Sequence, residues 1–351
     1  MKKAALFDPY LDILGGGERY MMTVAYHLSR LGFQTDIFWP DKNIKDDLEK
    51  RLGLDLGNVN FIDFNPEKKS LFEKLSFLKD YDFVFYLSDG SIPFLSGKKN
   101  ILHFQVPFHD IGGNNFLNKI KLRKINKIVC NSKFTKNVID KEYKVNSVVI
   151  YPPIDIVSFK PLKKENIILS VGRFTDLLHN KRQDVLVDAF KKMLKDGLEN
   201  WQLIIVGGDG EGKSFVSKLR KEAKNYPIEI ITNPDFSQLK RLYGKAKIFW
   251  TAAGFEIDQE KNPEKVEHFG ITTVEAMAAG LVPVAINKGG QPEIISDGQN
   301  GLLWNSINEL TKKTLSLINN HKEWLRLSKE AQKKADYFSQ KRFCHEIKEL
   351  L

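Results

Sequence analysis

Short runs of apolar residues alternate with longer amphipathic stretches along the whole chain. In residues 18–31, for example, Tyr20, Val24 and Leu28 recur at the spacing of one helix face. Short apolar runs bounded by polar or turn-forming residues indicate buried strands. The alternation predicts an open, mostly parallel sheet with helices on both faces, which is the α/β class. We expect strands at residues 4–7, 35–39, 83–87, 100–104, 127–130, 147–151, 167–172, 201–208, 228–232, 248–252 and 282–286.

A proline-rich connector interrupts this pattern at residues 152–161, PPIDIVSFKP. Three prolines in ten residues favour an extended segment over another helix or a central strand. The alternation then begins again, so the sequence predicts two domains. The length of 351 residues agrees, at about 150 residues per domain. Parallel sheets of this kind bind ligands beyond the carboxyl ends of their strands, so the loops that follow the strands are the places to search for a site.

The chain carries a formal charge of +10, and part of this charge lies in one stretch without acidic residues. Residues 111–139 contain seven lysines or arginines with apolar residues between them. Such a stretch suits nucleic acid, an anionic membrane or phosphorylated small molecules. Nucleic acid is disfavoured because only Phe116 and Phe134 supply rings for stacking. The expected contact is an anionic membrane surface, and the alternative is a basic helix and loop that face solvent; the residues concerned are Lys119, Lys121, Arg123 and Lys124.

The cysteine content and the lengths of the apolar runs favour a cytoplasmic location. Cys130 and Cys344 are the only cysteines and lie far apart, which argues against a disulfide framework or a structural zinc site. No run of about 18 apolar residues is present to span a membrane. The apolar run at residues 4–7 is too short for the core of a signal peptide. We therefore expect a cytoplasmic protein, with peripheral contact to the inner face of the membrane.

Two glutamates, Glu267 and Glu275, are separated by seven residues around a predicted helix start. Gly270, Thr272 and Thr273 between them indicate where the helix begins, and the free N–H groups of a helix start attract phosphate oxygens. Carboxylates accept hydrogen bonds from sugar hydroxyls, so these groups together suit a ligand that is part phosphate and part polyol. From the residues alone the alternative stays open, namely a solvated loop glutamate and a first-turn carboxylate favoured by the helix dipole.

A pair of cations follows the strand expected at residues 167–172. Gly172 ends that strand, and Arg173 and Lys181 flank the loop before the next predicted helix. A forked guanidinium and a lysine point charge are a common pair for a diphosphate. The alternative is two surface cations on a loop.

Glycines and a histidine are the candidates in the first half of the chain. Residues 12–20, DILGGGERY, place a glycine run after the first expected strand, where the backbone can approach a ligand closely. The run is not a dinucleotide-binding fingerprint, because Tyr20 occupies the third glycine position, and its alternative is a flexible turn. His103 lies near the end of the apolar run at residues 100–104, where most histidines are buried and merely hydrogen-bonded.

Together these motifs resemble the retaining glycosyltransferase family 4, also called group 1, whose members have the GT-B fold. The glutamates of residues 267–275 resemble the family's signature, and VGRF with Lys181 resembles its diphosphate-binding arginine and lysine. GGGER (15–19) resembles the first loop of the family's N-terminal domain. NSKFT (131–135) and IYPPID (150–155) resemble the segment that leads to its interdomain linker. The motifs follow the family's order over nearly the whole chain.

The resemblance implies two Rossmann-like, doubly wound domains that face each other across a cleft. The acceptor-side domain would comprise residues 1–155, and the nucleotide-sugar donor domain residues 156–335. Residues 336–351 would form a C-terminal helix that crosses back to the first domain. Gly16 and Gly17 would approach the phosphate or the acceptor.

The resemblance also implies a role for each candidate side chain. Glu275 would bind the ribose hydroxyls, and Glu267 would hold the donor sugar. Arg173 and Lys181 would neutralise the diphosphate leaving group. His103 would lie near the transferred sugar, so it joins Glu267, Arg173 and Lys181 in the expected catalytic set. Further donor contacts are expected from Gly16, Gly17, Gly172, His268, Phe269, Gly270 and Ile271.

The family's reaction retains the anomeric configuration, with the departing phosphate helping to deprotonate the acceptor, and no metal or other cofactor is implied. Residues 252–271 resemble family members that transfer mannose, including the eukaryotic lipid-linked oligosaccharide enzymes. GDP-mannose is therefore the expected donor, with a UDP-sugar as runner-up, and the expected acceptor is a glycan or a lipid-linked sugar. The alternative is a nucleotide-sugar-binding, epimerase or phosphorylase type of GT-B protein without transferase activity.

Overall fold

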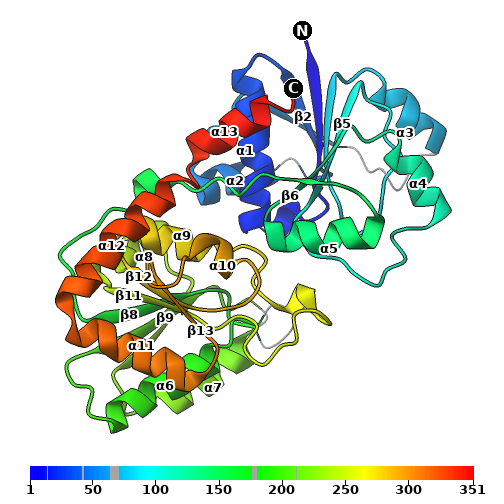
Figure 1. The fold of residues 1–351 in the computed structure, drawn as a ribbon. Coiled ribbons are helices and arrows are strands. Elements are labelled where there is room, and N and C mark those ends of the chain that lie inside the picture. The colour runs from blue at the N-terminus through cyan, green and yellow to red at the C-terminus, as the bar shows by residue number, and fades with distance from the viewer. Residues whose placement is uncertain (14, 42, 64–70, 176–179, 211) are drawn as a thin grey trace. The chain divides into compact units, whose positions relative to one another are not determined.

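The structure, a computed structural model, describes residues 1–13, 15–41, 43–63, 71–175, 180–210 and 212–351 (Figure 1). The chain forms two compact units. The first unit comprises Met1–Pro153 together with Gln340–Leu351, and the second comprises Ile154–Ser339. Each unit is built on one parallel sheet, so the loops that follow its strands gather at one edge.

The sheet of the first unit has seven strands in the order β3-β2-β1-β4-β5-β6-β7. All of its pairings are parallel. In β1, Ala4, Ala5 and Leu6 are fully buried, as expected of a strand that is covered on both faces. The strand order reverses between β1 and β4, which makes the carboxyl end of these two strands a place where a ligand is expected. The strands are β1 Lys3–Phe7, β2 Gln34–Phe38, β3 Val59–Ile62, β4 Phe83–Leu87, β5 Lys99–Phe104, β6 Lys127–Cys130 and β7 Val148–Val149.

The C-terminal helix α13 (Gln340–Lys348) belongs to the first unit and lies beside α1 (Gly16–Arg30) (Figure 1). Tyr20 of α1 packs edge-on against Phe343 of α13, with ring centroids 4.7 Å apart. Both rings are buried in the same apolar core as β1. The expected return of the C-terminal helix to the first unit is confirmed. The other helices of this unit are α2 Ile44–Leu52, α3 Leu71–Leu78, α4 Phe116–Leu122 and α5 Lys133–Tyr143.

The sheet of the second unit has six parallel strands in the order β10-β9-β8-β11-β12-β13. Its order reverses between β8 and β11, which makes the end of these two strands the place where a ligand is expected. The strands are β8 Ile167–Val171, β9 Gln202–Gly207, β10 Ile228–Thr232, β11 Ile248–Thr251, β12 Val282–Ile286 and β13 Leu302–Trp304. The helices are α6 Gln183–Lys195, α7 Lys213–Ala223, α8 Phe236–Lys245, α9 Ile271–Ala278, α10 Gln291–Ile294, α11 Ile307–Asn319 and α12 His321–Asp336.

Two apolar cores cover the faces of this second sheet. Successive side chains of a strand point to opposite faces, so Ile168 packs in the core of α6, α7 and α11, while Leu169 packs in that of α8 and α9. The buried Trp250 of β11 donates a hydrogen bond from Nε1 to Oγ1 of Thr314 in α11 at 3.0 Å. This bond satisfies a polar atom that burial would otherwise leave without a partner.

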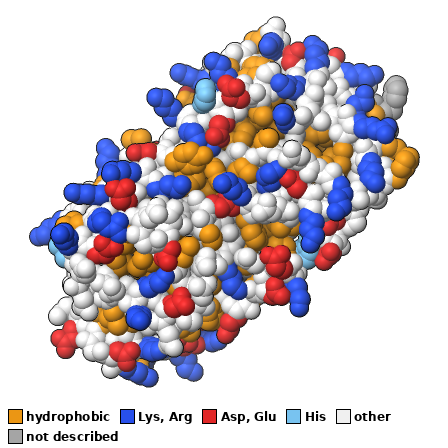
Figure 2. Space-filling model, in the orientation of Figure 1, with side chains coloured by type: hydrophobic (Ala, Val, Ile, Leu, Met, Phe, Trp, Pro, Cys, Tyr) orange, Lys and Arg blue, Asp and Glu red, His pale blue; other side chains and the backbone are white. Residues whose placement is uncertain are grey.

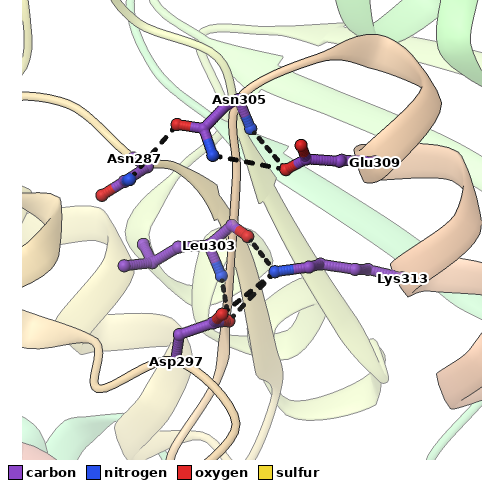
Figure 3. A network of polar contacts seen from close by, with 6 residues as sticks. All are labelled: Asn287, Asp297, Leu303, Asn305, Glu309 and Lys313. Carbon is purple, nitrogen blue, oxygen red and sulfur yellow. Dashed lines mark hydrogen bonds and ion pairs between the residues drawn. The ribbon is translucent and has the colours of Figure 1, made fainter.

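Polar contacts fix the last strand of the second sheet against α11 (Figure 3). Asp297 accepts hydrogen bonds from the backbone N–H of Leu303 at 2.8 Å and from Lys313 Nζ at 3.1 Å. Glu309 accepts from the backbone N–H of Asn305 at 3.0 Å. Because β13 pairs with β12, these contacts also hold the end of β12. From there the chain runs to Gly289 and Gly290, and Gly290 donates its N–H to the backbone oxygen of Glu267.

The doubly wound α/β architecture predicted from the sequence is confirmed. Three strands differ from the prediction. The strand expected at residues 147–151 is limited to Val148–Val149, and the prolines that follow it lack an N–H to donate to a sheet. The sequence pattern missed β3 and β13, which lie at the edges of their sheets and are only four and three residues long.

Asp8, the first residue after β1, is a buried carboxyl group whose titration affects stability. It is 4% exposed, and burial, followed by the charge of Glu18, raises the pKa of Asp8 to about 8. The folded protein therefore holds a proton between pH 4 and pH 8 that the unfolded chain releases. The free energy of unfolding consequently falls as the pH rises through this window, by about 1.4 kcal/mol per pH unit at most.

We expect Asp8→Asn to remove this loss, so the variant gains stability over the wild type as the pH rises from 5 to 8. The gain is read from denaturant unfolding at pH 5, 6.5 and 8. Asp47→Asn, at an exposed carboxylate of α2, is the control and should show little pH-dependent gain. A difference between Asp8→Asn and wild type that is constant over this range would contradict the assignment.

Candidate active site

The carboxyl edge of the second sheet carries the candidate groups of that unit. The loop after β8 contains Gly172 and Arg173, and the chain after β11 leads to Glu267 and the start of α9. These are the two strands between which the sheet order reverses. The local fold therefore brings the predicted cation loop and the predicted glutamate loop to one place.

An ion pair joins these two loops. Lys181 Nζ lies 2.7 Å from Glu267 Oε2, and the two side chains are 25% and 18% exposed. The next residue, Arg182, adds a second link, because its guanidinium donates to the backbone oxygen of Phe255 at 2.9 Å. Arg182 has a positive φ of 51°, a strained conformation that is common at functional sites. The charge of Lys181 thus has a carboxylate partner within the protein.

The backbone on either side of Glu267 is held by close contact with a glycine pair. Gly290 donates its N–H to the backbone oxygen of Glu267 at 2.8 Å. A Cβ added to Gly289 would lie 2.1 Å from the same oxygen, and one added to Gly290 would lie 2.6 Å from that of His268. A side chain at either position would displace this backbone. His268 is held further by Nε2, 3.1 Å from the backbone oxygen of Glu264.

The start of α9 is fixed by Gly270 and Gln291. Gly270 has a φ of +117°, and a Cβ there would lie 2.7 Å from Gln291 Nε2, so glycine is required on both counts. Thr273 donates from Oγ1 to Gln291 Oε1 at 3.0 Å. Phe269 is 3% exposed and packs against Phe338 at 5.4 Å between ring centroids. The Phe269 ring is therefore part of the packing beneath the start of α9 and is shielded from a ligand.

Glu275, one turn into α9, is oriented by a buried tyrosine that the sequence analysis missed. Tyr243 of α8 is fully buried and donates from its hydroxyl to Glu275 Oε2 at 3.0 Å. Burial, followed by the charge of Glu275, raises the pKa of Tyr243 well above its ordinary value, so the hydroxyl keeps its proton. In the sequence Tyr243 is indistinguishable from a core aromatic residue.

Gln183, the first residue of α6, was also missed and holds the cation loop. Its fully buried side chain donates from Nε2 to the backbone oxygens of Gly172 at 3.3 Å and Arg173 at 3.1 Å. A Cβ on Gly172 would lie 2.8 Å from Lys181 Cγ, so the glycine lets the lysine side chain cross the loop. The Arg173 side chain itself is exposed. The loop backbone is thus fixed while its guanidinium faces solvent.

The candidate site residues of the first unit are two glycines near the surface and one buried histidine. Gly16 and Gly17 begin α1, and Gly17 accepts a hydrogen bond from Gln105 Nε2 at 3.2 Å. His103 is fully buried, stacks on Tyr20 at 4.1 Å between ring centroids, and lies 3.1 Å through Nδ1 from the backbone oxygen of Val129. Burial lowers the pKa of His103 to about 3, so the ring is neutral. The ring is closed off from solvent in this conformation, and a place for His103 near the transferred sugar stays a prediction.

Comparison with known proteins identifies the family. Residues 154–334 match the family described as glycosyl transferases group 1, and residues 14–157 match the one described as glycosyltransferase family 4. These matches cover more than half of the chain. The chain therefore belongs to the group 1 glycosyltransferases, and the two parallel sheets are those of the GT-B fold.

Among individual proteins, the chain is 33% identical to an uncharacterized glycosyltransferase of Methanocaldococcus jannaschii, over 55% of this chain and 50% of that one. It is 28% identical to the GDP-Man:Man(3)GlcNAc(2)-PP-Dol alpha-1,2-mannosyltransferase of Dictyostelium discoideum, over 60% of this chain and 43% of that one. The chain thus spans about half the length of these relatives. Among solved structures, a glycosyltransferase from Rickettsia africae superimposes with a TM-score of 0.80 at 22% identity, covering 99% of this chain and 98% of that one.

The contact between Tyr243 and Glu275 generates a prediction for nucleotide binding. We expect Tyr243→Phe to lower affinity for a nucleoside diphosphate about tenfold, or ~1.4 kcal/mol, because Glu275 loses the donor that orients it. Isothermal titration calorimetry provides the measurement. Tyr226→Phe, at an exposed tyrosine of the same unit, is the matched control and should leave affinity unchanged. Equal affinities in both variants, with both folded, would show that the tyrosine only fills the core.

Proposed function

We propose that the protein is a retaining hexosyltransferase that moves a sugar, with mannose favoured, from a nucleoside diphosphate to a glycan or lipid-linked acceptor. The observation that carries this proposal is the ion pair of Lys181 with Glu267, which joins a cation loop to a carboxylate loop beside a helix start. A nucleotide sugar presents phosphate and hydroxyl groups within a few ångströms of each other. This arrangement of unlike groups matches that ligand.

The cations act on the leaving group. As the nucleoside diphosphate departs, negative charge grows on its phosphate oxygens, and fixed donors aimed at that charge lower the barrier. Arg173 supplies an exposed guanidinium, Lys181 supplies an ammonium group, and the first N–H groups of α9 add a helix start. We assign no divalent cation to the reaction, because these residues provide the positive charge that a metal would supply.

The carboxylates act on the two sugars of the donor. Glu275, oriented by Tyr243, accepts hydrogen bonds from the ribose hydroxyls. Glu267 accepts from the hydroxyls of the transferred hexose, and the backbone from His268 to Ile271 completes its surroundings. Lys181 donates a hydrogen bond to Glu267. A bound diphosphate competes for the lysine, so binding of the leaving group and release of Glu267 to the sugar are coupled.

The identity of the donor is proposed from similarity to known proteins and not from a contact with the nucleotide base. The Dictyostelium relative is by name a GDP-mannose-dependent enzyme, so GDP-mannose is the proposed donor and a UDP-sugar the runner-up. A thermal-shift comparison of GDP and UDP separates the two. A nucleotide at 100 times its dissociation constant stabilises the fold by about 2.7 kcal/mol.

The division of roles is tested with three single variants. Glu275→Gln and Arg173→Ala should lower affinity for the nucleoside diphosphate at least tenfold. Glu267→Gln should bind it nearly as well as wild type but release GDP from GDP-mannose at least a hundredfold more slowly, because the contact acts in the transition state. The readouts are calorimetry and a GDP-release assay. Glu260→Gln, an exposed glutamate of the same segment, is the matched control. Wild-type affinity and turnover in the double variant Glu267→Ala/Glu275→Ala would overturn the proposal.

We further propose that α4 and its flank bind the anionic cytoplasmic leaflet, where a lipid-linked acceptor would reside. All residues of α4 are described, and none of them is buried. Phe116, Leu117 and Ile120 are 78%, 51% and 39% exposed. Figure 2 shows basic side chains spread over the face that it draws. On α4 the basic side chains are accompanied by these exposed apolar ones. Within the described residues, helices are too short or too polar to cross a bilayer.

Both parts of the α4 surface contribute to this contact. Each lysine or arginine near an anionic leaflet adds roughly 1 kcal/mol, and these charges are screened beyond about 8 Å at physiological ionic strength. The exposed apolar side chains add binding free energy by inserting into the membrane interface, and salt does not screen this contribution. Membrane binding should therefore weaken with salt without vanishing.

Liposome co-sedimentation with and without anionic lipid tests this contact. Changing Lys119, Lys121, Arg123 and Lys124 together to Gln should abolish the dependence on anionic lipid. Phe116→Ser/Leu117→Ser should remove the salt-resistant part. The control removes four exposed charges from α7, at Lys213, Lys218, Arg220 and Lys221, and should sediment like wild type. Equal sedimentation of all four proteins would favour an acceptor in solution.

A further inference from the structure

We propose that Lys164 is a positioning residue for nucleotide binding, because it holds α8 against α9 and so keeps Tyr243 within reach of Glu275. The inference rests on the proposed function, in which Glu275 accepts hydrogen bonds from the ribose hydroxyls of the donor. Lys164 belongs to the connector that precedes β8, where its position in the sequence gives no sign of such a role.

The Lys164 side chain joins the last carbonyl groups of two helices. Its Nζ donates hydrogen bonds to the backbone oxygens of Ala246 at 2.9 Å and Ala279 at 2.7 Å. These two residues are the C-caps of α8 and α9. The last carbonyls of a helix lack partners within it, and the helix dipole makes that end negative, so an ammonium group is favoured there. One side chain thus links two helices that are separated in the sequence by β11 and a long loop.

Lys164 makes these contacts although burial disfavours its charge. The side chain is partly buried, whereas its neighbour Lys163 is exposed. Burial lowers the pKa of Lys164 from its ordinary value to about 7. The neutral amine still has two N–H groups, one for each of the carbonyls, so the link between the helices persists on both sides of this pKa. Because this lysine is held against a desolvation cost, the placement of the helices explains it better than stability does.

The connector around Lys164 is itself attached to the end of α8. Leu162 donates its N–H to the backbone oxygen of Gly244 at 3.0 Å, and Glu165 donates to that of Lys245 at 2.8 Å. A Cβ on Gly244 would lie 2.7 Å from Leu162 Cγ, so the glycine lets the connector approach the helix closely. Lys164 therefore extends toward α9 from a backbone that is already fixed to α8.

The same two helices carry the contact that orients Glu275. Tyr243 lies about one turn before the C-cap of α8, and Glu275 lies about one turn before the C-cap of α9. Tyr243 donates to Glu275 Oε2 at 3.0 Å, and the N–H of Ala279 donates to the backbone oxygen of Glu275 at 3.1 Å. Lys164 and Tyr243 are thus two links between α8 and α9, about one helical turn apart.

Apolar packing alone does not fix these helices along one another. Tyr243, Ala246 and Ala279 lie in one apolar core, but hydrophobic contact is non-directional, whereas hydrogen bonds restrict both distance and angle. Loss of Lys164 would remove one of the two links, and the Glu275 carboxylate would then be placed less accurately for the ribose. The diphosphate is expected at the opposite end of α9, so its contacts should persist.

The experiment compares nucleotides that have ribose hydroxyls with analogues that lack them. Calorimetry measures the affinity of the full chain for GDP and UDP, each beside its 2′,3′-dideoxy analogue. We expect Lys164→Met to bind the nucleotide that wild type prefers about tenfold more weakly, because the Glu275 contact is misplaced. The dideoxy analogue should bind to the variant and to wild type with equal affinity. Lys163→Met, which removes an exposed lysine from the preceding position, is the matched control and should behave like wild type with every ligand.

A double variant tests whether Lys164 acts through Tyr243. Tyr243→Phe already removes the hydroxyl that orients Glu275, so adding Lys164→Met should weaken nucleotide binding by less than about twofold. An independent structural role would instead multiply the two losses. Lys164→Gln, a shorter side chain that keeps an amide donor, replaces Lys164→Met if that variant does not fold.

Three results would overturn the inference: Lys164→Met binds GDP and UDP as wild type does, it loses affinity for nucleotide and dideoxy analogue to the same extent, or its loss multiplies with that of Tyr243→Phe. Failure of wild type to bind either nucleotide would instead overturn the proposed function. Equal affinity of wild type for a nucleotide and its dideoxy analogue would remove the ribose contact of Glu275, and the inference with it.

Discussion

Lys181 and Glu267 form a partly buried ion pair on which the arrangement of the second unit's carboxyl edge depends. Exposed ion pairs contribute about 0–1 kcal/mol, and partial burial adds a desolvation cost to each ion, so stability alone gives little reason for the pair. Its effect is geometric. It ties the loop after β8 to the segment that leads into α9, two segments far apart in sequence. A ligand that carries both phosphate and hydroxyls would offer an anion to Lys181 and hydrogen-bond donors to Glu267.

This arrangement requires backbones to approach one another more closely than side chains allow. A Cβ at Gly207 would lie 2.0 Å from the backbone oxygen of Gly172, and one at Gly212 would lie 1.9 Å from that of Phe174. Together with Gly289 and Gly290 under Glu267, these positions hold both loops from beneath. Because these glycines have no side chains, the charged side chains form the outer layer of both loops. Rigid backbone beneath polar groups is the preorganisation that electrostatic catalysis needs, because the donors then do not have to reorient during the reaction.

The architecture could be predicted from the sequence because buried parallel strands are nearly continuous apolar runs, and each central strand appeared as one. The loop positions of Glu267, Arg173 and Lys181 could be predicted because these residues follow strand ends, where a motif keeps its spacing. Tyr243 and Gln183 could not, since nothing in their spacing distinguishes them from a core aromatic or a polar helix start. Their roles arise only where α8 packs against α9 and where α6 meets the loop after β8. His103 illustrates the converse, because its position after an apolar run is compatible with exposure or burial and the stacking on Tyr20 decides it.

The carboxyl edges of the two sheets differ in the groups they carry. Where the strand order reverses in the second unit, the loops present Arg173 and Lys181 together with Glu267, and in the first unit Asp8 follows β1 directly. Burial raises the pKa of Asp8 to about 8, so its carboxyl group is mostly protonated at neutral pH. Charged groups of both signs therefore lie together at the edge of the second unit. A ligand that is part phosphate and part polyol needs that combination, because its phosphate requires donors and its hydroxyls require acceptors.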